Sequence, residues 1–132
     1  MNAEDRLAIE ELFARHWRAF DTGDAATWLA TLTPDATYDI EGHHYSGQDQ
    51  LLRWYQRLAS DGTLKGRQHF TDRLILDPDD DKCAVESYIM ETCRLSNGIC
   101  TIVALGEYRD ICVRVAGGWL FSERYGSPWS GG

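Results

Sequence analysis

Four polar side chains of this 132-residue chain are candidates for chemistry: His16, Asp21, His69 and Arg124. Imidazole, carboxylate and guanidinium groups move protons and stabilise developing charge at neutral pH. A neutral imidazole can remove a carbon-bound proton when a carboxylate holds its other ring nitrogen. These residue types therefore indicate acid–base catalysis, provided that the fold brings them together.

His16 falls on the apolar stripe of a predicted helix, four residues from both Leu12 and Phe20. This spacing places it on the inward face. A buried histidine needs partners for both ring nitrogens. His16 is therefore either a core residue with satisfied nitrogens or part of a site.

Asp21 and Arg124 each have a structural alternative. Asp21 closes the same helix and could cap the next one, but Asp24 fits that role better. Arg124 shares a strand face with Leu120 and could point into the core. A buried arginine there needs a carboxylate partner or an anionic ligand.

His69 is ambiguous from its pattern alone. Strict alternation places Phe70, Leu74 and Leu76 on the inward face of one strand, which would leave His69 facing solvent. A bulge at the start of the strand would turn His69 inward, and bulges are frequent beside active sites. Both orientations stay open on this evidence.

Neither a metal nor a nucleotide cofactor is indicated. His43 and His44 are adjacent, so on a strand they point to opposite faces and cannot chelate one ion together. The acidic run 77–81 lacks the spacing of a calcium loop and is typical of a solvated turn. The nucleophile-elbow, Walker and dinucleotide motifs are missing from the sequence.

The elements that must position the candidates follow a helices-then-strands order. Asn2 begins a first helix that runs to Phe20, and turn residues separate it from the next elements. The predicted helices after it are 25–32 and 46–59, the second opened by a capping box, and the predicted strands are 36–41, 67–76, 82–95, 99–115 and 119–125, with a polar turn at 42–44. This order predicts an α+β fold in which three helices pack on a strongly curved, mainly antiparallel sheet that encloses a pocket. Residues 1–126 form one domain in this interpretation, and 127–132 form a tail.

Charge and composition exclude several classes of protein. The chain has 13 Lys and Arg against 21 Asp and Glu, a net charge of −8, so neither nucleic acid nor an anionic membrane is an expected partner. It contains neither a secretory apolar segment nor an apolar run that could span a bilayer. The four cysteines form no CxxC pair, and we expect reduced thiols in a cytoplasmic protein.

Three segments resemble the SnoaL-like family of the nuclear-transport-factor-2-like superfamily: 9–24, 33–47 and 118–124. With the order of helices and strands, this resemblance covers nearly the whole chain. It implies a cone-shaped α+β fold. It also implies a small-molecule substrate and a homodimer formed through the outer face of the sheet, whereas the chemistry varies within the superfamily.

Within that superfamily, the sequence is most similar to the pattern of scytalone dehydratase, bile-acid dehydratases and hexachlorocyclohexane dehydrochlorinase. Those enzymes pair an aspartate that ends the first helix with a histidine that opens the first long strand. Asp21 and His69 match these places, and Arg124 matches an arginine of the last strand. The resemblance therefore implies an Asp21–His69 dyad with His69 turned inward. His16 falls where the dehydrochlorinase has a lysine, which makes His16 and Arg124 candidates to assist the leaving group.

The resulting hypothesis is a cofactor-independent lyase, specifically a dehydratase, acting on a small hydrophobic or cyclic metabolite. An isomerase or a polyketide-cyclase-like enzyme with the same dyad is one alternative, and a non-catalytic small-molecule-binding or dimerisation module is another. The aromatic residues expected to line the substrate pocket are Trp17, Phe20, Tyr38, Trp54 and Tyr88.

Overall fold

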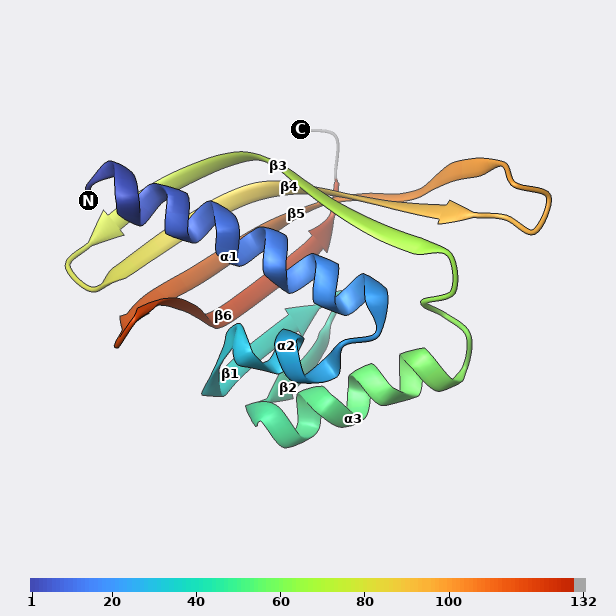
Figure 1. The fold of residues 1–132 in the computed structure, drawn as a ribbon, viewed down its shortest axis with the longest axis horizontal. Helices are drawn as coiled ribbons and strands as arrows, with labels where there is room; N and C mark the ends of the chain where they lie inside the picture. The colour runs from blue at the N-terminus through green and yellow to red at the C-terminus, as the bar shows by residue number, and fades with distance from the viewer. Residues whose placement is uncertain (130–132) are drawn as a thin grey trace.

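The computed structural model describes residues 1–129 and contains three helices and six strands (Figure 1). The helices are α1 (Ala3–Thr22), α2 (Ala25–Ala30) and α3 (Gly47–Ser60). The strands are β1 (Leu32–Ile40), β2 (His43–Ser46), β3 (Arg67–Asp79), β4 (Lys82–Arg94), β5 (Cys100–Val115) and β6 (Gly118–Pro128).

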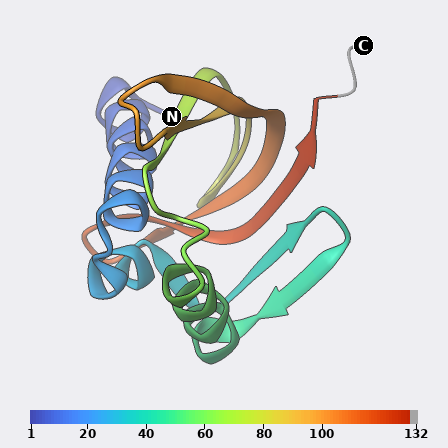
Figure 2. The same ribbon diagram turned by 90° about the vertical axis from the view of Figure 1, so that its right-hand side faces the viewer.

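All six strands form one sheet in the order β2-β1-β6-β5-β4-β3. Only β1 and β6 run parallel, and every other neighbouring pair is antiparallel. The sheet curls strongly, and the helices lie on its concave side, with α1 across the long strands and α3 beside β1 and β2 (Figure 2). The predicted α+β cone is therefore confirmed.

The bounds of several elements differ from those expected. α2 stops at Ala30, because β1 already begins at Leu32 and includes Pro34. Residues 43–46 pair with β1 as strand β2 instead of forming a turn, so His43 and His44 are strand residues. At the start of α3 the Ser46 side chain makes no capping bond.

The last strand extends into the segment that was expected to be a tail, residues 127–132. β6 continues through residues 127 and 128, where Ser127 and Pro128 pair with β5. Residues 130–132 of the expected tail lie outside the described part of the chain.

A bulge in β3 decides which of its side chains face the helices. The register with β4 shifts between Asp72 and Ile75, and Arg73 adopts a left-handed backbone with φ 58°. An extra residue in one strand reverses the alternation of its faces. Odd-numbered residues such as His69 are the more buried ones before the bulge, and even-numbered residues such as Leu76 after it. Reading backwards from Leu76 without the bulge therefore gives the wrong face for His69, and for the same reason Phe70 lies outside.

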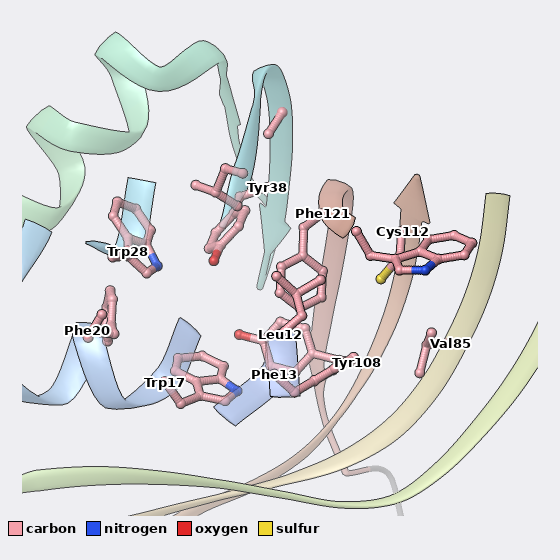
Figure 3. Packing of buried hydrophobic residues seen from close by; sticks show 14 of the residues in the cluster. Leu12, Phe13, Trp17, Phe20, Trp28, Tyr38, Val85, Tyr108, Cys112 and Phe121 are labelled. Atoms are coloured by element: carbon pink, nitrogen blue, oxygen red, sulfur yellow. The ribbon is translucent and has the colours of Figure 1, made fainter. Parts of the chain in front are cut away.

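The core lies between α1 and the concave face of the sheet and is rich in aromatic side chains (Figure 3). Trp17 and Phe20 of α1 pack against each other edge to face, and Phe13 packs in the same way on Phe121 of β6. The Asn2 side chain accepts a hydrogen bond from the amide of Asp5 and so begins α1. Large rigid rings thus fix α1 against the strands that carry the candidate residues.

Two further features concern the length of the helices and the state of the cysteines. Within residues 1–129, the helices are all too short or too polar to cross a membrane. The four cysteines are free thiols, with Cys83 and Cys112 buried opposite each other on β4 and β5.

Candidate active site

Asp21 and His69 meet where the last turn of α1 passes the start of β3. Asp21 Oδ1 lies 2.6 Å from His69 Nδ1, and Asp21 Oδ2 accepts a hydrogen bond of 2.8 Å from the His69 backbone amide. Gly23, with φ 81°, ends α1 directly after this turn, and the Asp24 side chain caps α2 as expected. Asp21 is therefore available to hold the imidazole and the strand that carries it.

Glu91 of β4 completes the contacts of the imidazole and was not among the residues singled out from the sequence. Its Oε1 lies 2.7 Å from His69 Nε2, and its Oε2 accepts a hydrogen bond of 2.8 Å from Arg67 Nη1. The signal was present, because alternation from the buried Val85 and Ser87 places Glu91 on the inward face of β4. The histidine thus joins two carboxylates in a row, Asp21–His69–Glu91.

The two carboxylates determine the charge of His69. Burial lowers the pKa of His69, but hydrogen bonds and charges from Asp21 and Glu91 outweigh it, so the pKa rises above its usual 6.5. The pKa of Glu91 falls below its usual 4.5, because the hydrogen bond to His69 outweighs burial and Arg67 adds to the effect. An imidazole that donates from both nitrogens is an imidazolium, and its stacking on Trp17, with 4.5 Å between ring centroids, favours the same charge.

A cavity of about 390 Å³ opens beside this row of residues. His69 and Glu91 form part of its wall, together with Trp17, Phe20 and Trp54, which were expected to line a pocket. Tyr108 of β5 and the apolar side chains Ile40, Leu58, Leu64 and Ile89 complete much of the remaining wall. The site therefore joins a polar end, able to exchange protons, to an apolar and largely aromatic wall.

His16 does not reach the cavity. Thr31 Oγ1 donates to the carbonyl of Trp28, so it accepts from His16 Nδ1 at 2.7 Å, and His16 Nε2 accepts from Trp28 Nε1 and the Tyr38 hydroxyl. Burial lowers the pKa of His16 well below 6.5, and the charges of Arg124 and His69 add to this. His16 is thus a neutral core histidine, and the leaving-group role suggested for it is wrong, since its nitrogens are occupied.

Arg124 is also buried below the cavity floor. Its Nε and Nη2 donate to the two carboxylate oxygens of Asp110 at 2.8 and 3.2 Å, and both side chains are fully buried. The guanidinium lies 4.4 Å from the ring centroid of Tyr108 and 4.3 Å from that of Phe121. The expected carboxylate partner is therefore present, but Arg124 does not line the cavity, so its direct contact with a leaving group is a second correction.

The two predicted tyrosines also lie elsewhere. Tyr38 is buried under the cavity with its hydroxyl on His16, and desolvation is the largest cause that raises its pKa. Tyr88 lies on the outer face of the sheet, is 47% exposed and packs on Trp129. Tyr88 alternates with the inward residues of β4, which is why it cannot line the cavity.

The described residues contain no cluster of side chains that would ligate a metal ion. Among residues 1–129 there is no group of three or more His, Cys, Asp or Glu side chains arranged to hold an ion. His44 instead lies 3.1 Å from Asp39 on β2 and β1, remote in the sheet from β3 and β4.

The helices and the curled six-stranded sheet form a cystatin-like cone of the nuclear-transport-factor-2-like class, and solved structures share this fold. A Nostoc punctiforme protein of unknown function with a cystatin-like fold has a TM-score of 0.88 at 22% identity, covering 99% of this chain and 96% of that one. A variant of a Mycobacterium tuberculosis protein of unknown function has a TM-score of 0.84 at 24% identity, covering 93% of this chain and 70% of that one. A candidate scytalone dehydratase from Novosphingobium aromaticivorans has a TM-score of 0.80 at 19% identity, covering 94% of this chain and 83% of that one.

The family itself is defined by sequence. Residues 1–125 match the SnoaL-like domain, and the chain belongs to that family. A search of curated proteins found no match. The resemblance seen in the sequence is thus confirmed at the level of the family and of the fold.

Proposed function

We propose that this protein is a cofactor-independent lyase, specifically a dehydratase of a small cyclic or hydrophobic molecule. The observation that carries the proposal is the hydrogen-bonded row Asp21–His69–Glu91, of which His69 and Glu91 form part of the wall of an aromatic cavity. Membership of the SnoaL-like family and the fold shared with a candidate scytalone dehydratase are consistent with it.

In the proposed mechanism Glu91 is the base and His69 is the acid. The lowered pKa of Glu91 keeps it ionised, and the raised pKa of His69 keeps its proton available. Glu91 takes a proton from a substrate carbon, a carbon–carbon double bond forms, and the neighbouring carbon–oxygen bond breaks. The hydroxyl leaves as water with the Nε2 proton of His69, after which Glu91 returns its proton to Nε2. Asp21 stabilises the imidazolium and fixes the ring throughout.

A panel of ring-bearing β-hydroxyketones in deuterated water tests the reaction class. A dehydratase converts a member to its conjugated enone, which absorbs in the near ultraviolet, and water is lost. Deuterium uptake or double-bond migration without loss of water would favour the isomerase or cyclase alternative. Saturable binding with neither change would favour a non-catalytic module.

The pH dependence of kcat/KM is expected to be bell-shaped. The rate falls on the acid side as Glu91 is protonated, below its usual 4.5, and on the alkaline side as His69 loses its charge, above 6.5. In Arg67→Gln the acid limb should move to higher pH, because Arg67 holds the pKa of Glu91 down. If kcat/KM instead only increased with pH through neutrality, the reaction would require an uncharged His69, which would contradict the proposal.

We further propose a homodimer formed through the outer face of the sheet. That face exposes the apolar side chains Phe70, Tyr88, Leu105 and Trp129 around one groove, and large exposed apolar patches mark interaction surfaces. A dimer in sedimentation velocity is expected, and Tyr88→Glu should dissociate it, because the new charge would be buried without a partner. Gln56→Glu on the exposed side of α3 adds the same charge and should leave the dimer intact. A monomeric unmodified protein would exclude this arrangement.

A further inference from the structure

The cavity wall carries more negative than positive charge. Its lining contains the carboxylates Glu41 and Glu91 and one cation, the His69 imidazolium, but neither lysine nor arginine. Glu41 is exposed and has a left-handed backbone with φ 50°, whereas the Glu91 side chain is only 23% exposed. A ligand that enters therefore meets negative charge at both acidic positions.

Each cation near the cavity already has a carboxylate partner, and the one guanidinium nitrogen without a hydrogen bond, Arg124 Nη1, is fully buried. Arg67 donates to Glu91, and both nitrogens of His69 face carboxylates. Arg124 lies under Tyr108 and holds Asp110. An anionic ligand would lose its hydration without gaining a free cationic partner, which is costly in a partly buried site.

The two carboxylates of the wall also specify part of what the ligand must offer. An ionised carboxylate only accepts hydrogen bonds, so Glu91 and Glu41 require a donor such as a hydroxyl group. The rings of Trp17, Phe20 and Trp54 supply flat apolar contacts for the rest of the molecule. The chemistry of the wall therefore matches a ring that carries O–H donors.

We propose that the cavity selects uncharged ring alcohols and discriminates against carboxylates and phosphates. This inference rests on the proposed function for the identity of the cavity as the active site. It goes beyond that function by stating the charge and the hydrogen-bonding character of the substrate.

Calorimetric titration with two matched probes tests the selectivity. Naphthylmethanol and naphthoate, substituted at the same ring position, share the ring and differ in charge at pH 7.5, a value chosen above the usual carboxyl range. We expect the alcohol to bind the unmodified protein at least about tenfold more tightly. Equal or tighter binding of naphthoate would overturn the proposal, and so would failure of both probes to bind.

Three variants locate the origin of the discrimination. Glu91→Gln releases His69 and Arg67 from a carboxylate, so the preference for the alcohol should fall at least about threefold, and Glu41→Gln should lower it in the same direction. Glu86→Gln removes the same charge from the exposed face of β4 and should leave the preference unchanged. An unchanged preference in both Glu91→Gln and Glu41→Gln would overturn the assignment to these carboxylates, with folding checked by circular dichroism.

The outcomes separate this inference from the proposed function. Selective binding of the alcohol without turnover of any hydroxyketone would remove the lyase proposal and leave the selectivity standing. Turnover accompanied by preferential binding of naphthoate would remove the selectivity proposal and leave the lyase proposal standing.

Discussion

Replacing His69 by glutamine is expected to lower the rate of dehydration by about 10²–10⁴-fold, the usual contribution of a positioned acid–base group. Glutamine can still hydrogen-bond to Asp21 or Glu91, but it cannot carry the proton that the leaving hydroxyl needs. The expected change is in kcat, measured with the hydroxyketone that the panel identifies. Asp21→Asn should have an effect in the same direction, because an amide does not offset the charge of the imidazolium.

His44→Gln provides the matched control for this prediction. His44 also lies within hydrogen-bonding distance of an aspartate, but its side chain is 57% exposed on β2, in a strand at the opposite edge of the sheet from β3. Its activity should equal that of the unmodified protein. If His69→Gln kept its activity within a few fold, proton transfer would have to be assigned to another group, and the row Asp21–His69–Glu91 would be structural.

Replacing Asp110 by alanine is expected to lower the free energy of unfolding by about 3–5 kcal/mol, the usual effect of breaking a buried ion pair. Arg124 would remain charged in the core, since a guanidinium does not lose its proton at accessible pH. Its remaining neighbours include five aromatic rings, of which those of Phe121 and Tyr108 are the nearest, and rings do not replace a bidentate carboxylate. Urea unfolding followed by tryptophan fluorescence measures the change.

The double variant Asp110→Leu with Arg124→Met tests the reason for that loss. Removing both charges should recover most of the lost stability, because apolar side chains of similar volume often replace a buried pair at little cost. Asp72→Ala breaks the exposed pair with Arg73, whose side chains are both 73% exposed, and should hardly move the urea midpoint. A double variant as unstable as the single one would show that packing, rather than unpaired charge, explains the effect.

The fold was largely predictable, since the helical stripe of α1 and the turns between the long strands are local patterns. The site was predictable only in part. Asp21 and His69 were identified by resemblance, because their contact joins α1 to β3 across the chain. Glu91 could have been found from the alternation of β4, whereas the partners of His16 depend on packing that no local pattern contains.

The errors at Tyr88 and Arg124 have different physical causes. Tyr88 was assigned by residue type, although the alternation of its own strand places it outside. The prediction that Arg124 lies on the inward face of β6 is confirmed. At that point of β6, however, inward side chains enter the core and do not reach the cavity wall. Side-chain depth depends on how the sheet curls, and a single sequence does not specify the curl.

The bulge at Arg73 makes the position of His69 depend on the length of β3 as well as on its composition. Deleting one residue there, with the distal half of β3 kept in register, would turn His69 away from Asp21 and toward the outer face without replacing Asp21, His69 or Glu91. Inserting one residue into a regular strand would do the opposite. The contact between His69 and Asp21 therefore depends on a single residue of chain length in β3, although no part of that contact lies at the bulge.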